Sequence, residues 1–270
     1  MTDKNRNLIV RVLTVVVLLP GVLWLIWRGG LPFALLIAAA TALCALELNQ
    51  LAQREISGAA LASVGGAFLI PLILEAPLGA IGAPAILTGV VILAFTDALL
   101  FETEVANAAR RVSLAVLGAT YPGLLLAALV PLRQLPRGEW WILLAIVVTW
   151  LNDTFAYFVG RAFGRRKLYE RISPNKTWEG AAGGAAGSIA GALVIRSLWL
   201  PVIPFWGAAL IGAGAAVLGP LGDLSESMLK RAFGAKDSGR LLPGHGGLLD
   251  RIDALLFNAP FVLLCARLLV

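Results

Sequence analysis

Nine apolar segments, most of them about 20 residues long, constrain the fold of this 270-residue chain more than any other feature. A helix needs about 20 residues to cross the hydrocarbon core of a bilayer, and an isolated strand cannot cross it because its backbone polar groups would lack partners. The segments are 8–27, 32–52, 59–74, 80–101, 112–132, 140–159, 178–200, 202–221 and 254–270. The sequence therefore predicts an all-α polytopic integral membrane protein with about nine transmembrane helices.

The composition excludes a large soluble domain. Charged residues make up 14% of the chain and hydrophobic residues 59%, whereas soluble domains carry about 25% charged residues. Cys44 and Cys265 lie far apart in apolar segments, so we predict small buried side chains rather than a disulfide. We expect a single membrane domain over residues 1–270, in which residues 1–140 form a less specific multi-span region and residues 141–270 carry the chemistry.

The basic residues predict how the chain crosses the membrane. With the N-terminus in the cytoplasm, all but five of the 22 Lys and Arg residues fall on the cytoplasmic side, as the positive-inside rule requires. The exceptions are Arg28, Arg133, Arg137, Arg196 and Arg267. The odd number of spans then places the C-terminus on the opposite side. This topology, together with an anionic lipid or phosphate substrate, explains the net charge of +6 without nucleic-acid binding.

The chemistry is expected in two long cytoplasmic loops, 160–177 and 222–253. The second loop holds ten charged residues: Asp223, Glu226, Lys230, Arg231, Lys236, Asp237, Arg240, Asp250, Arg251 and Asp253. If its start is helical, Asp223 and Ser227 share a face and Glu226 can pair with Lys230; Asp250 and Asp253 have helical spacing too. Carboxylate and hydroxyl oxygens suit Mg²⁺, and the basic residues suit phosphate.

The alternative is a solvated loop whose opposite charges neutralise one another. Two observations weigh against it. The aspartates begin at the end of a membrane helix, where charge is costly, and residues 243–247 form a glycine-rich turn around His245, the single histidine of the chain. A lone histidine is more often a structural hydrogen-bonding residue, but the glycines beside it expose a backbone that a phosphate could approach.

In the second loop the sequence resembles the signature of the phosphatidate cytidylyltransferase family, also called CDP-diacylglycerol synthases. The matching positions are Ser227, Lys230, Arg231, Lys236, Asp237, Gly239, Leu242, Pro243, His245, Gly246, Gly247, Leu248, Asp250, Arg251 and Asp253. The first loop resembles two further family stretches, Asn152-Asp153 through Gly160-Arg161 and Ser173 through Gly180, with Asn175 where many members carry lysine. Residues 1–140 match only as a hydrophobic region.

The resemblance implies transfer of a cytidylyl group from CTP to phosphatidate, with formation of CDP-diacylglycerol and pyrophosphate at the cytoplasmic face of the inner membrane. We assign Mg²⁺ to Asp223, Asp250 and Asp253, with Ser227 as a candidate fourth ligand. The catalytic candidates are Asp250, Lys230 and Arg231. The expected substrate-binding residues are Lys236, Asp237, His245, Gly246, Gly247, Arg251, Asn152, Asp153 and Lys176. The family also suggests a second cation such as K⁺ and a homodimer.

Two other functions are compatible with charged membrane helices. Another membrane phosphotransferase could act on a lipid phosphate, but other families of that kind arrange their aspartates differently. A transporter would place its ionisable residues at mid-span on broken helices, whereas here they gather at one face.

Three local features carry further expectations. We predict that Ser173-Pro174 begins the seventh helix, so that Lys176 stands at its positive end. Glu47, Asn49 and Asp97 are interpreted as interhelical hydrogen-bonding groups, because no motif surrounds them. Small residues spaced by three and four predict close helix packing, which also favours a dimer; they are Gly180, Gly183, Gly184, Gly187 and Gly191.

Overall fold

The computed structural model describes residues 18–270, except 53–55, 78 and 240–245. The described part contains eight helical stretches long and apolar enough to cross a membrane. A shorter apolar helix, Leu18–Arg28, covers the described portion of the first predicted segment, and the rest of that segment lies outside the described residues. The all-helical polytopic class is therefore confirmed, while the orientation of the termini stays a prediction.

The chain folds into two compact units. Unit 1 comprises Met1–Val130 and Ala235–Arg251, and unit 2 comprises Pro131–Gly234 and Ile252–Val270. The signature segment is thus shared between the units, because its described residues between Ala235 and Arg251 group with the N-terminal helices. The single membrane domain expected from the sequence stays a prediction.

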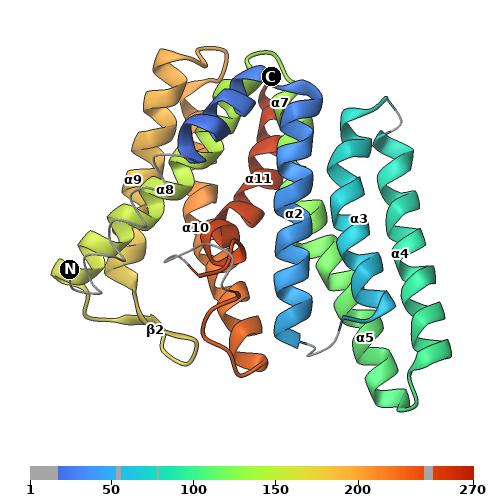
Figure 1. Cartoon of the computed structure of the whole chain (residues 1–270). Coiled ribbons are helices and arrows are strands. Elements are labelled where there is room, and N and C mark those ends of the chain that lie inside the picture. The colour runs from blue at the N-terminus through green and yellow to red at the C-terminus, as the bar shows by residue number, and fades with distance from the viewer. Residues whose placement is uncertain (1–17, 53–55, 78, 240–245) are drawn as a thin grey trace, which may run out of the picture. The chain divides into compact units, whose positions relative to one another are not determined.

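Unit 1 is built from helices that follow one another along the chain. They are α2 (Gly30–Ala52), α3 (Gly58–Glu75), α4 (Gly79–Phe101), α5 (Val105–Gly118), the π-helical turn η1 (Ala119–Leu124) and α6 (Leu125–Ala127), after which α7 (Leu129–Arg133) leads into unit 2. Figure 1 shows α2 to α5 side by side, with α3 packed against α2, α4 and α5. Pro122 lies within η1; because it lacks an N–H, it interrupts the α-helical hydrogen bonds there.

Buried polar side chains join α2 to α3. Thr41 Oγ1 donates to the Ala67 carbonyl oxygen at 2.7 Å, and Asn49 Nδ2 donates to Ser63 Oγ at 3.2 Å. The interhelical role predicted for Asn49 is therefore confirmed. Cys44 is free and buried, as is Cys265 in unit 2, which confirms that prediction too.

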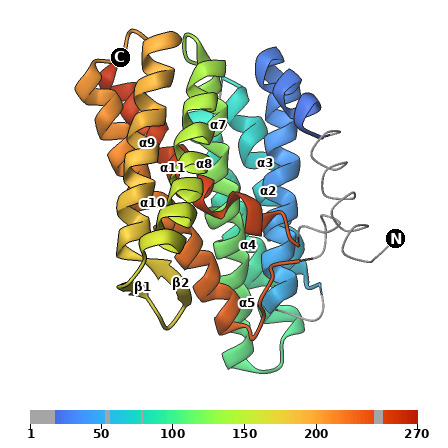
Figure 2. The same ribbon diagram turned by 90° about the vertical axis from the view of Figure 1, so that its left-hand side faces the viewer.

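Unit 2 contains a small hairpin between two of its helices. Its elements are α8 (Gly138–Phe163), β1 (Lys167–Tyr169), β2 (Ser173–Thr177), α9 (Trp178–Leu198), α10 (Phe205–Ala232) and the greater part of α11 (Leu249–Leu269). The two strands pair antiparallel and connect the ends of α8 and α9 (Figure 2). Helix α9 packs against both α8 and α10.

The predicted start of the seventh helix at Ser173-Pro174 is wrong. These residues form β2, and the helix begins at Trp178. The reason is local: Thr177 has extended backbone angles and its Oγ1 accepts a hydrogen bond from the Gly180 N–H at 3.1 Å, so it is the N-cap. Lys176 therefore lies on a strand, not on the first turn of a helix.

The small-residue stripe of α9 faces α8. A Cβ added at any of its five glycines would meet atoms of α8, and at Gly184 it would lie 2.9 Å from the Asn152 carbonyl oxygen. The predicted close packing is thus confirmed. Because the stripe is covered within the chain, it gives no support for a dimer, which stays a prediction.

We expect Gly184→Ala to destabilise the protein, because its Cβ would press on the α8 backbone. The matched control is Gly89→Ala in α4, where a Cβ meets nothing within 4 Å. Both changes raise helix propensity by up to about 1 kcal/mol, so the difference reports packing, which costs about 1–3 kcal/mol when overfilled. Thermal unfolding in detergent should show a lower Tm for Gly184→Ala only. Equal Tm values would contradict the close packing.

Candidate functional site

Helix α10 extends beyond its apolar segment and carries the start of the signature. Residues 222–232, predicted as part of a loop, are helical. Ser227 Oγ donates to Asp223 Oδ1 at 3.3 Å, and Lys230 Nζ pairs with Glu226 Oε2 at 2.5 Å. Both i,i+4 relations expected for a helix are confirmed. Because Glu226 is only 1% exposed, Lys230 neutralises a buried charge, while Arg231 is exposed.

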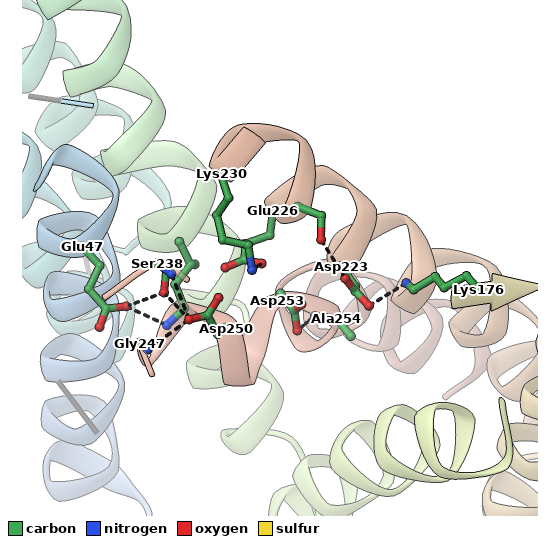
Figure 3. Close-up of polar contacts among 12 residues, drawn as sticks. Glu47, Lys176, Asp223, Glu226, Lys230, Ser238, Gly247, Asp250, Asp253 and Ala254 are labelled. Atoms are coloured by element: carbon green, nitrogen blue, oxygen red, sulfur yellow. Dashed lines mark hydrogen bonds and ion pairs between the residues drawn. The ribbon is translucent and has the colours of Figure 1, made fainter. Parts of the chain in front are cut away.

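Asp223 is held by Lys176 of the hairpin. The Nζ of Lys176 lies 2.6 Å from Asp223 Oδ2 (Figure 3). It also lies 3.5 Å from the carbonyl oxygen of Pro220, one turn earlier in α10. Strand β2 therefore places a cation beside Asp223, at the point where the apolar part of α10 gives way to its charged part.

Two more carboxylates join Asp223 in unit 2. Asp153 of α8 is close enough to Asp223 and Lys176 for their charges to interact, and Asp253 of α11 interacts with the same charges and with Asp153. Gly222 permits this gathering, because its missing side chain lets α10 approach the backbone of α11 at Asp253. The structure thus brings together four predicted site residues from three helices and one strand.

Uncharged polar residues line the interior of unit 2 near this cluster. Asn258 Nδ2 of α11 donates to Thr149 Oγ1 of α8 at 2.8 Å. Asn152, which is 1% exposed, packs against Gly184 and Gly219. Asn152 therefore lies inside the unit, although it directly precedes Asp153 of the charged cluster. Asn258 and Thr149 were not predicted, because the sequence shows them only as polar residues in apolar segments.

The carboxylates of unit 2 fit a magnesium ion by their chemistry. Within the described ranges, no group of three or more His, Cys, Asp or Glu side chains is placed so that it could hold a metal ion. Mg²⁺ is usually held by one or two carboxylates, with water and substrate phosphates completing its shell. Asp223 and Asp253 supply such oxygens, so their chemistry fits the ion, and their assignment as its ligands stays a prediction.

Asp250 organises the signature segment of unit 1. Its Oδ2 accepts hydrogen bonds from Ser238 N at 2.9 Å, from Ser238 Oγ at 3.0 Å and from Gly247 N at 3.0 Å. Gly246 has a φ of +82°, a conformation that other residues rarely adopt. Asp250 therefore links Ser238 to Gly247. Its roles in metal binding and catalysis stay predictions.

Glu47 is the functional candidate that the sequence reasoning missed. The predicted interhelical hydrogen bond is confirmed, because Glu47 of α2 bonds Leu249 of α11. What the sequence did not indicate is that the same carboxylate bonds the signature segment at Ser238 and Leu248. The signal available was a single acid in an apolar helix. Nothing in the local pattern indicated a partner about 200 residues away.

The remaining predicted residues lie at the surface or outside the described residues. Lys236, Asp237 and Arg251 are exposed. His245 lies in the range 240–245, outside the described residues. The roles assigned to these four residues stay predictions.

The turn after α8 is held by a residue of the second family stretch. Glu179 Oε2 accepts hydrogen bonds from the backbone N–H groups of Arg165 at 3.1 Å and Arg166 at 3.2 Å. Gly160 and Gly164 pack against Thr177. Glu179 is therefore needed to bond the turn, and Gly160 and Gly164 leave room for Thr177.

Comparison with known proteins identifies the family. The family model described as the cytidylyltransferase family matches residues 9–269. This chain belongs to the cytidylyltransferase family.

Several curated relatives are similar over most of their length. The phosphatidate cytidylyltransferase of Brucella abortus biovar 1 (strain 9-941) is 39% identical over 260 residues, covering 96% of this chain and 93% of the relative. That of Bacillus subtilis (strain 168) is 36% identical over 271 residues, covering 97% of each. That of Staphylococcus saprophyticus is 48% identical over 126 residues, about half of each chain.

We expect the cap of α9 to depend on a hydroxyl at position 177. Thr177→Val preserves the shape but removes the acceptor for the Gly180 N–H, at a cost of about 1 kcal/mol. That corresponds to a fall in Tm of roughly 2–4 °C in a chain of this size. Thr177→Ser, which keeps the hydroxyl, is the control. If Thr177→Val is as stable as Thr177→Ser in detergent, the hydroxyl does not stabilise the helix.

Proposed function

We propose that this protein transfers a cytidylyl group from CTP to phosphatidate, forming CDP-diacylglycerol and pyrophosphate. The observation that carries the proposal is the near full-length similarity to relatives named phosphatidate cytidylyltransferase, at 39% and 36% identity. The charged cluster of unit 2 supports it, because a phosphate transfer between two anions needs carboxylates for a cation and basic groups for phosphate oxygens.

Cytidylyl transfer to phosphatidate does not depend on a general base, because the attacking phosphate is already ionised. A phosphate oxygen of phosphatidate attacks the α-phosphorus of CTP, a new P–O bond forms, and the bond to the bridging oxygen of the β-phosphate breaks, so that pyrophosphate leaves with the electron pair. A phosphate monoester has a second pKa near 6 and is mostly a dianion at pH 7. The protein must therefore position two anionic substrates and offset their repulsion.

Basic residues of unit 2 are the candidates for that task. Lys176 is held at the carboxylate cluster by Asp223, and Lys230 is held by Glu226 one turn further along α10. A cation whose position is set by a carboxylate partner loses less freedom when it meets a phosphate. We assign both lysines, with Arg231, to the phosphates of CTP or phosphatidate.

We assign Mg²⁺ to Asp223 and Asp253, with Asp250 and Ser227 as further predicted ligands. When bound, the ion would supply positive charge to the transferring phosphate and the leaving pyrophosphate. Asp153 contributes negative charge to the same cluster and is assigned, with Asn152, to ordering it. A second cation such as K⁺ stays a prediction.

The reaction also suggests where the site lies. CTP is water-soluble and phosphatidate is confined to lipid, so both can be reached only near a membrane interface. The excess of basic residues on one side supports a cytoplasmic site in the inner membrane. Homodimer formation remains part of the proposal through the family resemblance alone.

Purified protein supplied with Mg²⁺, CTP and phosphatidate should release pyrophosphate. EDTA should abolish the release, because without a cation the carboxylates would repel the phosphates. ATP and GTP should replace CTP poorly. A coupled pyrophosphate assay measures both effects. Equal rates with all nucleotides would refute cytidine selection, and no release with CTP would refute the proposed activity.

Asp223→Asn and Asp253→Asn should each lower kcat by about 100-fold or more, because each removes a charge that the ion requires. They should also raise the Mg²⁺ concentration needed for half-maximal rate. Glu104→Gln is the control: Glu104 is exposed and makes no side-chain cap hydrogen bond at the start of α5. If both Asp variants fold and match the control in rate, the metal assignment is wrong.

A further inference from the structure

A buried carboxylate on α2 is left unused by the proposed chemistry. Glu47 is only 4% exposed. Its Oε1 accepts a hydrogen bond from Leu248 N at 2.9 Å. Its Oε2 accepts from Leu249 N at 2.9 Å. It also shares the single hydroxyl proton of Ser238, whose Oγ lies 3.3 Å from Glu47 Oε2 and 3.0 Å from Asp250 Oδ2 (Figure 3). Every one of these contacts lies within unit 1.

The donors explain why an ionised acid is suited to this place. Leu248 and Leu249 stand at the start of α11, where backbone N–H groups have no carbonyl partner inside the helix. A carboxylate satisfies both groups and is favoured by the positive end of the helix dipole. The ion pairs found among the described residues do not include Glu47. The two carboxylate oxygens are therefore bonded by the signature segment, and they satisfy backbone N–H groups of that segment in turn.

Two signature glycines make room for the carboxylate. A Cβ at Gly239 would lie 2.8 Å from Glu47 Oε1, and a Cβ at Gly247 would lie 2.7 Å from Oε2. Both distances are shorter than real Cβ contacts. Glycine at these positions lets Glu47 approach the backbone closely, so Glu47, Gly239 and Gly247 form one packing arrangement.

The same arrangement reaches a predicted catalytic residue. Ser238 Oγ lies 3.3 Å from Glu47 Oε2 and 3.0 Å from Asp250 Oδ2, while Asp250 also accepts from the N–H of Gly247. Glu47 and Asp250, which are far apart in the sequence, thus both bond Ser238 and the backbone within residues 247–249. Displacing Glu47 would release the segments on which the position of the Asp250 carboxylate depends.

We propose that Glu47 is a positioning residue of the transferase: it holds Ser238, Leu248 and Leu249, and through them sets the position of Asp250 and the first turn of α11. The proposal rests on the proposed function, in which Asp250 takes part in cytidylyl transfer. Glu47 itself touches no substrate in this role.

The test is Glu47→Gln, which keeps the size but replaces one acceptor oxygen with an NH₂ group that faces N–H donors. We expect kcat to fall about 10- to 100-fold, the usual effect of losing a residue that orients a metal-site ligand. The KM for CTP should change less than kcat, because Lys176 and Lys230, which are assigned to substrate phosphates, keep their own partners Asp223 and Glu226. Hydrogen exchange at the amides of Leu248 and Leu249 should become faster in the same variant.

Thr41→Val is the matched control. Thr41 is also buried on α2 and donates to α3, at the Ala67 carbonyl oxygen, without touching the signature segment. It should lower the Tm while leaving both kcat per folded protein and the exchange of Leu248 and Leu249 unchanged. A purely structural role for Glu47 would make the two variants behave alike.

Gly239→Ala supplies a second route, because it displaces the carboxylate without removing it. Gly65→Ala, where a Cβ meets nothing within 4 Å, is its control. If Glu47→Gln folds with wild-type kcat and wild-type exchange, the proposal is overturned. If that variant cannot be purified folded, the same result for Gly239→Ala overturns it. Absence of pyrophosphate release by the wild-type protein would instead reject the proposed function, and the exchange measurement would still decide the role of Glu47.

Discussion

A polar group buried in a membrane protein has no bulk water to bond, so it must find its partner within the chain. This requirement organises both units. In unit 1, Thr41 and Asn49 join α2 to α3, and in unit 2 Asn258 of α11 bonds Thr149 of α8. Apolar contacts alone would distinguish poorly between neighbouring helices, because lipid tails are as apolar as leucine. Hydrogen bonds between particular residues select the arrangement.

The same requirement shapes the site. Several charged residues have partners of opposite charge or backbone donors: Lys176 with Asp223, Lys230 with Glu226, and Glu47 with the start of α11. Glycines let these partners approach, since Gly222 brings the backbone of α11 close to α10. Close helix packing and charge placement therefore depend on each other, because small residues leave the space that charged side chains and their partners occupy.

The sequence predicted the membrane class and most helix positions because both depend on local hydrophobicity. It also predicted the Asp223–Ser227 and Glu226–Lys230 relations, since spacing along one helix is enough to infer them. It failed at the β1–β2 hairpin, where a short polar stretch could equally have been a loop or a helix start. Thr177 caps α9, so the helix begins after it. From the sequence alone, the capping residue is hard to choose among several Ser and Thr residues.

By itself, the sequence determined that this chain is a polytopic helical membrane protein of the cytidylyltransferase family with its charges concentrated in two segments. Hydrophobicity, helical spacing and motif identity are properties of neighbouring residues, so they can be read directly. The tertiary structure alone decided that Lys176 pairs with Asp223 and that the charge of Asp153 interacts with both. It alone also joined Glu47 to Leu249, 202 residues away. Such contacts depend on how the chain returns to itself, and the partner of a buried charge is known only once that path is formed.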